Sequence, residues 1–197
     1  MISVWTKDAP VTPKSMKIAG VLAMTSACVT LPLAYLSYQM EGAAKGETAI
    51  IQAAIQISGT FLFVAIVLFL KKFINDIYNF TAVNRNLDMM IIADIVTGVL
   101  TVIALCVPSV KDSAGYAALT LLVMLGIVQV QFGYKLLKLP DDLGGLLKPF
   151  CFANMATGIL LASILLIPLG ILVSAVSDLM LGTIFLNTCK LFRTSEK

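Results

Sequence analysis

The sequence contains no histidine among its 197 residues. This absence excludes histidine-ligated haem, most zinc chemistry and every catalytic triad that uses an imidazole as its base. The four cysteines stand alone in apolar segments, without the C-x-x-C spacing of a redox motif or a metal knuckle. We therefore expect no metal and no cofactor. We expect the cysteines to be small buried hydrophobic residues or, for Cys151 and Cys189, sites of lipidation.

Charged residues are also scarce. They make up 13% of the chain, whereas hydrophobic residues make up 59%, and the mean hydropathy is +0.96. Soluble domains contain about 25% charged and about 45–50% apolar residues, so this composition predicts an integral membrane protein with the lipid bilayer as its main partner. The basic residues form small clusters between apolar runs and no continuous basic stripe, which argues against nucleic acid as a partner.

What the sequence has in abundance is long apolar runs. An apolar run of about 20 residues is long enough to cross a bilayer. It must be helical there, because lipid offers no hydrogen-bond partner to the backbone. The outer connection at residues 168–171 is so short that the last two runs form a tight hairpin. The predicted fold is therefore all-α and polytopic, with six transmembrane helices at 18–40, 48–70, 89–109, 115–134, 149–168 and 171–191.

Lysine and arginine lie almost entirely on one side of the predicted membrane. The two tails and the loops between the second and third and between the fourth and fifth helices carry twelve of them, and the other side carries Lys45 and Lys111. The positive-inside rule then places both termini in the cytoplasm, as a tail of residues 1–17 and a tail of residues 193–197 around one transmembrane domain, 18–192. The loop 71–88 is either a short interfacial segment or an ordinary linker.

An internal repeat joins the two later pairs of helices. The segment ADIVTGVLTVIALCVP at 93–108 aligns without gaps to ANMATGILLASILLIP at 153–168, with six identities in sixteen positions. The first helix contains a weaker echo. The chain therefore reads as three in–out–in hairpins, at 18–70, 89–137 and 149–192, related by an axis along the membrane normal.

Residues of this repeat resemble the HdeD-like family of small bacterial membrane proteins, which are built from three helical hairpins. The tryptophan before proline that is typical of that family is replaced by Val107 and Ile167. The resemblance covers about the last hundred residues and implies the plasma (inner) membrane of a bacterium and a stress-related role. It is carried by Thr97, Gly98, Leu100, Pro108 and Gly126 with the counterparts Thr157, Gly158, Leu160, Pro168 and Gly182.

Two acids lie inside predicted spans. Asp94 is about 9 Å into the cytoplasmic leaflet at 1.5 Å per residue, and Asp178 is at a similar depth from the outer end, so the sequence predicts them in opposite leaflets. No lysine or arginine lies in a span interior to pair with them. An unpaired carboxylate in the bilayer centre costs about 2.5–3.5 kcal/mol, so both are expected to face the helix bundle.

The polar residues in the spans have two interpretations. Each of Asp94, Asn154 and Asp178 is followed four residues later by a glycine (Gly98, Gly158 and Gly182), which favours polar contacts beside close helix packing. The alternative is a proton or cation path that Gln52 and Gln56, four residues apart on one helix face, would extend. Gln129 and Gln131 are two residues apart and face different directions, which argues against a shared site.

The function that follows is non-enzymatic. The acid-rich loop LPDDLGGLLKP at 139–149 lacks the spacing of a metal or phosphate motif, so we expect no catalytic residues. We expect a protein that acts through helix–helix contacts, as an accessory subunit of a membrane complex or as a stress-related membrane protein, with other membrane subunits or a second copy as partners. The alternative is a small transporter or channel that uses the intramembrane carboxylates.

Overall fold

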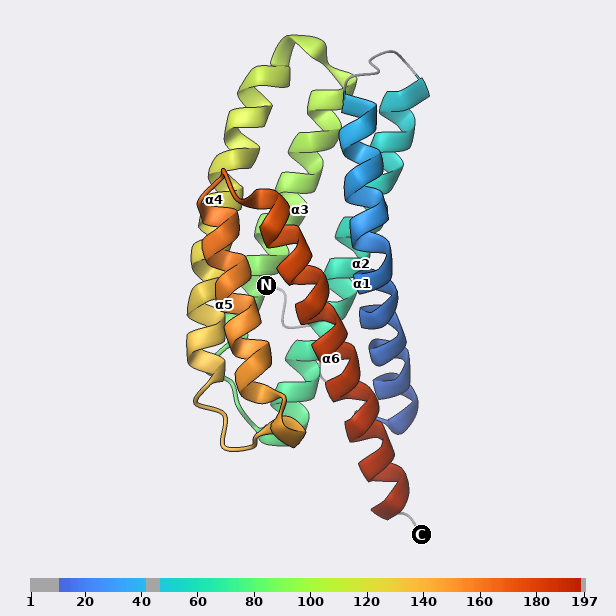
Figure 1. Cartoon of the computed structure of the whole chain (residues 1–197), viewed down its shortest axis with the longest axis vertical. Helices are drawn as coiled ribbons and strands as arrows, with labels where there is room; N and C mark the ends of the chain where they lie inside the picture. The colour runs from blue at the N-terminus through green and yellow to red at the C-terminus, as the bar shows by residue number, and fades with distance from the viewer. Residues whose placement is uncertain (1–10, 42–46, 196–197) are drawn as a thin grey trace.

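The computed structural model describes residues 11–41 and 47–195, and within these residues the chain is helical with no strand. The prediction of an all-α protein is confirmed. Each helix contacts the helix before it and the helix after it, and the last closes a ring against the first (Figure 1). The six α-helices are α1 (Pro13–Glu41), α2 (Glu47–Tyr78), α3 (Asn84–Cys106), α4 (Lys111–Leu136), α5 (Leu147–Ala162) and α6 (Ile167–Ser195), with short 3₁₀ turns η1 (Pro108–Val110) and η2 (Leu143–Gly145).

Successive helices run in opposite directions along the long axis of the ring (Figure 1). We call the end where α1 begins and α6 ends the basal end, and it also holds the connections 79–83 and 137–146. The opposite end, which holds the connections 107–110 and 163–166, is the distal end. The closure of the ring is uneven, since α1 contacts α6 far more extensively than it contacts α2. The first predicted hairpin is therefore the loosest of the consecutive pairs.

Five of the helices are long and apolar enough to cross a membrane, and α5 is the exception. It has 16 residues, which span about 24 Å, less than the hydrocarbon thickness of about 30 Å. The prediction of a span over 149–168 followed by a turn at 168–171 was wrong. The turn occupies residues 163–166, and Pro168 lies in the first turn of α6, where a helix tolerates proline because no backbone donor is needed there.

The other helix ends also differ from the predicted spans. The second helix continues to Tyr78 and the third begins at Asn84, so the connection between them is only residues 79–83. Asn79 ends α2 in the left-handed conformation with φ of 50°, and its N–H donates to the carbonyl of Asn75 over 3.1 Å. Most of the loop predicted at 71–88 is thus helix, because hydropathy marks where charge begins and not where helical hydrogen bonding ends.

The distal turn between α5 and α6 contains a strained residue. Ile164 has φ of +57°, a conformation that β-branched side chains rarely adopt. The hydroxyl of Ser163 holds the turn by donating to the Leu160 carbonyl over 2.7 Å and accepting from the Leu166 N–H over 3.3 Å. This short, polar-braced turn ends α5 before it reaches the distal end of the other helices (Figure 1).

We expect the Ile164→Gly variant to be more stable than the wild type by about 0.5–1 kcal/mol. The left-handed conformation costs isoleucine about 1–2 kcal/mol, which exceeds the roughly 0.5–1 kcal/mol of chain entropy that glycine adds. Leu165 in the same turn has no positive φ, so Leu165→Gly should instead lose stability. Denaturant titration in mixed micelles measures both, and a gain for both variants would show that strain at residue 164 is not the cause.

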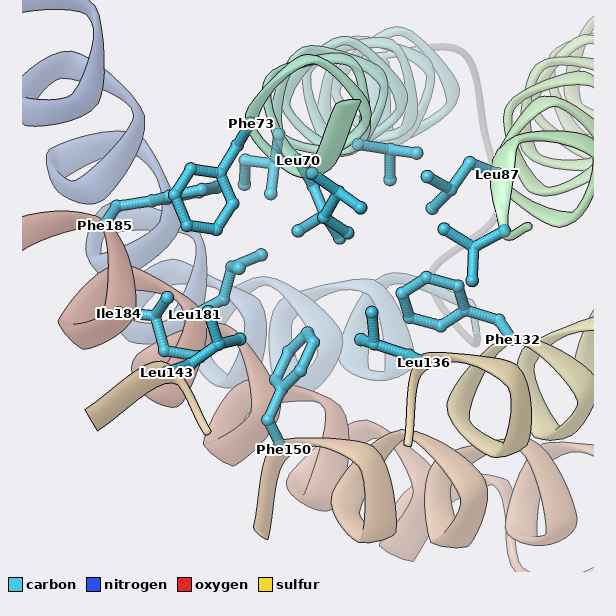
Figure 2. Close-up of a cluster of buried hydrophobic side chains, with 14 of the residues drawn as sticks. Leu70, Phe73, Leu87, Phe132, Leu136, Leu143, Phe150, Leu181, Ile184 and Phe185 are labelled. Atoms are coloured by element: carbon cyan, nitrogen blue, oxygen red, sulfur yellow. The ribbon is translucent and has the colours of Figure 1, made fainter. Parts of the chain in front are cut away.

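The hydrophobic core fills the basal half of the ring. Phe73, Phe132 and Phe185 are completely or almost completely buried, and Phe73 packs edge-on against Phe185 with ring centroids 5.4 Å apart. Figure 2 shows these side chains pointing from all sides toward the centre of the ring. The connection between α4 and α5 adds Leu139 and Leu143 to the same cluster and so covers the basal opening. We call this cluster the basal plug; its other labelled members are Leu70, Leu87, Leu136, Phe150, Leu181 and Ile184.

Candidate functional site

The interior face of the ring changes from apolar to polar along its length. On α2, residues spaced alternately three and four apart form one helix stripe, and its basal members lie in the plug. From the distal end the stripe reads Gln52, Gln56, Gly59, Phe63, Ile66, Leu70 and Phe73. The opposing stripe of α3 reads Thr101, Thr97, Asp94, Met90 and Leu87. Both helices therefore direct polar residues into the distal half and apolar residues into the basal half.

Asp94 faces α2 from this stripe. Its carboxylate lies within hydrogen-bonding reach of Thr60, whose hydroxyl also lies 3.5 Å from Nε2 of Gln56. In the described part of the chain, Oδ2 of Asp94 and Oγ1 of Thr97 are buried without a hydrogen-bond partner. The backbone carbonyl of Thr97 does accept a hydrogen bond, from the hydroxyl of Thr101 over 2.9 Å. Two buried polar atoms one helix turn apart thus lack partners.

Asn154, the repeat counterpart of Asp94, has the opposite environment. Its Nδ2 donates to Oγ of Ser177 on α6 over 2.8 Å, and its Oδ1 accepts from Nε2 of Gln129 on α4 over 3.3 Å. All three side chains are buried. Asn154 also donates to the Phe150 carbonyl of its own helix. One amide therefore joins three helices, and its hydrogen-bonding groups are satisfied by neighbours.

We expect Asn154→Leu to lower the free energy of unfolding by about 2 kcal/mol. Interhelical hydrogen bonds in membranes average about 0.6 kcal/mol, and this change removes two and leaves Gln129 and Ser177 buried without a partner. Denaturant titration measures the loss. The matched control is Asn187→Leu on exposed α6 surface, which should stay within about 0.5 kcal/mol of the wild type. Equal effects at both positions would contradict the role of the Asn154 contacts.

Asp178 lies between α6 and α1 and has a partner. Ser26 on α1 donates to Oδ2 of Asp178 over 2.8 Å. One turn further, α1 and α6 approach closely at two glycines: a Cβ on Gly182 would lie 2.8 Å from Cγ of Met24 and 3.1 Å from the Gly20 carbonyl oxygen. Asp178 and Gly182 therefore lie in the same contact between α1 and α6, as their spacing of four residues predicted. The acid is bonded across this contact to Ser26.

The predicted placement of the two acids in opposite leaflets stays a prediction. Asp178 lies seven residues, about 10 Å, distal of Phe185. Asp94 lies six residues, about 9 Å, distal of Asp88, which pairs with Lys71 two residues distal of Phe73. Because Phe73 and Phe185 pack against each other, the two acids lie at similar levels distal of the basal plug.

The glycines of the repeat all face a neighbouring helix, but with different closeness. Gly158 on α5 lies against Gly126 on α4, and a Cβ on either would overlap the carbonyl oxygen of the other. Gly98 on α3 lies against a side chain, since its Cβ would be 2.8 Å from Oγ1 of Thr60. The backbone contact between α4 and α5 is continued by Gly133, whose Cβ would lie 2.8 Å from the Cys151 carbonyl oxygen.

Polar contacts at the basal end tie α3 to its neighbours. Lys71 and Asp88 form an ion pair of 2.5 Å between α2 and α3. Lys135 donates to Oδ1 of Asn86 over 2.7 Å, and Asn86 donates to Oε1 of Gln131 over 3.4 Å, between α3 and α4. Gln129 thus contacts α5 and Gln131 contacts α3, in agreement with their predicted directions.

A cleft of about 460 Å³ opens on the outer surface between α2 and α3. Its lining is apolar apart from Gln56 and Thr60, and Phe61 and Ile57 at its edge are 76% and 60% exposed. Gly98 forms part of its wall, so the cleft depends on the missing side chain there. Comparison of the chain with protein-family models, with curated proteins and with solved structures gives no match.

Several contact residues were not predicted from the sequence. Ser177 and Thr60 complete the contacts of Asn154 and Asp94, and Asn86 anchors the basal end, yet none was singled out. The signal for Thr60 is its position: it lies four residues after Gln56, on the same face of α2. Ser177 has no comparable signal in the sequence. It is next to Asp178 along the chain, but the two residues contact different helices.

Proposed function

We propose that this chain is a non-enzymatic integral membrane protein that acts through helix–helix contacts, as an accessory subunit that receives a transmembrane helix of a partner. The observation that carries the proposal is the cleft between α2 and α3. Large apolar side chains border this cleft. Both flanking helices are long and apolar enough to span the membrane. Helices associate inside membranes by close side-chain packing, because lipid supplies no hydrophobic force between them. A cleft of this kind offers a surface for such packing.

The packing of the ring supports the choice of this cleft. The α2 helix makes fewer contacts with its two neighbours than α4 or α6 makes with theirs. The helix therefore has free surface on the side of Phe61 and Ile57. A partner helix seated there would contact α2 and α3 together and cover the exposed phenylalanine.

The basal plug disfavours the alternative function of a channel. A conducting path needs polar or wettable lining through the whole bilayer. In the described residues, the basal half of the ring centre is filled by phenylalanine and leucine side chains, several of them with no exposed surface. Asp94 and Asp178 therefore do not belong to a continuous polar path through the ring.

The orientation and family are further parts of the proposal. We infer that the basal end faces the cytoplasm, because the helix ends and the connection 137–146 at this end carry Lys71, Lys72, Arg85, Lys138 and Lys148. The three hairpins, and the resemblance to the HdeD-like family in a bacterial plasma membrane, rest on the sequence repeat. The similar direction of Gly98 and Gly158, each toward the preceding helix, supports a common origin of the two later hairpins.

Site-specific photo-crosslinking in native membranes tests the proposal. A photoreactive amino acid at position 61 should give a crosslinked protein adduct. The same group at Ile159, which is 60% exposed on α5, should give lipid adducts alone. Val99→Trp, which fills the cleft from its exposed edge, should reduce the adduct at position 61 at least tenfold. A chain that remains monomeric in mild detergent and forms no protein adduct at position 61 would contradict the proposal.

A further inference from the structure

The distal half of the ring interior brings oxygen-bearing side chains together on two opposing stripes. Gln56 lies beside α3 at the level of Gly98, where a Cβ would be 3.6 Å from Nε2 of the amide. Asp94 and Thr97 lie within one helix turn of Gly98. Thr60 joins the carboxylate to the amide, since its hydroxyl is within hydrogen-bonding reach of Asp94 and lies 3.5 Å from Nε2 of Gln56. Asp94 and Gln56 are therefore close across one helix contact distal of the basal plug, and Thr97 lies one helix turn from Asp94 on α3.

The protein leaves this group incompletely paired. Oδ2 of Asp94 and Oγ1 of Thr97 are buried without a hydrogen-bond partner in the described part of the chain, whereas Asn154 at the equivalent repeat position is fully bonded. A buried polar atom without a partner is costly inside a bilayer, where water does not replace the missing bond. The repeat thus contains one satisfied polar site and one that is open to a ligand.

The chemistry of the donors identifies the ligand class. Carboxylate, hydroxyl and amide carbonyl oxygens are hard ligands that suit alkali and alkaline-earth cations. One carboxylate balances one positive charge, and no lysine or arginine lies on the interior stripes of α2 and α3 to do so. We propose that Asp94, Thr97 and Gln56 form a binding site for a single monovalent alkali cation that enters from the distal end of the ring.

The route to the site is one-sided. Gly59 lies on the interior stripe of α2, is exposed, and has no atom within 4 Å of the position of a Cβ. The position next to the site on α2 is therefore open, and the turn between α5 and α6 lies below the distal ends of α3 and α4 (Figure 1). The basal plug closes the other side (Figure 2). The site loads from one side and does not conduct, which is compatible with an accessory protein.

Thermal unfolding of the purified full-length protein in lipid nanodiscs tests the site. NaCl, KCl and LiCl are titrated at constant ionic strength against choline chloride. A ligand that binds only the folded state raises Tm, and at ten times Kd the expected rise is about 3–6 °C. The rise should saturate, and equilibrium binding of radioactive sodium or of rubidium as a potassium substitute should give one ion per chain.

Variants distinguish the site from a general effect of salt. Asp94→Asn and Thr97→Val should each abolish at least nine-tenths of the Tm rise, whereas Asp178→Asn should retain it, because Asp178 is paired with Ser26 in another helix contact. Asparagine at position 94 reproduces the residue at 154, so folding should tolerate it, and Thr97→Val keeps the side-chain shape. No saturable rise in the wild type, an unchanged rise in Asp94→Asn, or an equal loss in Asp178→Asn would each overturn the proposal.

Discussion

Replacing Phe185 with alanine is expected to lower the free energy of unfolding by about 3–5 kcal/mol, the largest effect of any single substitution considered. Phe185 has no exposed surface and packs against Phe73 at the centre of the basal plug. Its removal leaves a cavity that the surrounding helices close only in part, since they are held by neighbours on both sides. Denaturant titration in mixed micelles measures the loss.

Two comparisons test whether the burial of Phe185 in the basal plug causes the loss. Phe152 is 58% exposed on α5, so Phe152→Ala should change the free energy of unfolding by no more than about 0.5 kcal/mol. A double-mutant cycle with Phe73→Leu and Phe185→Leu should give a coupling of about 0.5–1.5 kcal/mol for the edge-on aromatic pair. If Phe185→Ala were as mild as Phe152→Ala, the basal plug would not be the stabilising centre of the ring.

Gly158→Leu is expected to lower the free energy of unfolding by about 3 kcal/mol. A side chain at this position meets the carbonyl oxygen of Gly126 and Cγ2 of Val130, which would lie 2.9 Å from the new Cβ. A backbone atom of a packed helix cannot turn aside as a side chain can, so α4 and α5 must separate. The loss should be accompanied by weaker protection of both helices from amide hydrogen exchange.

Glycines elsewhere on the ring supply the control. Gly115 on α4 has nothing within 4 Å of the Cβ position, so Gly115→Ala should stabilise the protein by up to about 1 kcal/mol through helix propensity. Gly98→Ala meets the hydroxyl of Thr60, which can rotate, and its cost should lie between the two. A ranking in which Gly98 is more sensitive than Gly158 would contradict the backbone contact as the cause.

The asymmetry of the ring links these stability predictions to the proposed functions. Aromatic and leucine side chains close the basal half, and the distal half has a shortened α5, an open position at Gly59 and unpaired polar atoms around Asp94. The stabilising core and the proposed cation site thus lie in different halves of one ring. Substitutions in the basal half should lower stability, and substitutions at Asp94 and Thr97 should alter cation response with little loss of stability.

Sequence reasoning located the helices but misjudged where some of them end. Apolar runs identify a membrane helix because each residue contributes to transfer into lipid independently of its neighbours in space. The end of α5 depends on a local event, the hydrogen bonds of Ser163 and the left-handed Ile164, to which hydropathy does not respond.

The sequence repeat aligns Asp94 with Asn154 but could not predict that their environments differ. The glycine four residues after each of them faces the preceding helix. Whether the polar side chain at each place finds partners depends on Gln129 and Ser177, which approach Asn154 from two other helices. Partners that are 25 and 23 residues away leave no periodic trace in the sequence.

The sequence by itself determined that this protein is helical and belongs in a lipid bilayer, because composition and apolar run length act locally along the chain. It also determined which acids and amides lie among apolar residues. The tertiary structure alone decided that the six helices form a ring, that its basal half is packed shut, and that Asp94 keeps an unpaired oxygen. These properties arise from packing between helices, where side chains far apart in the sequence meet or fail to meet.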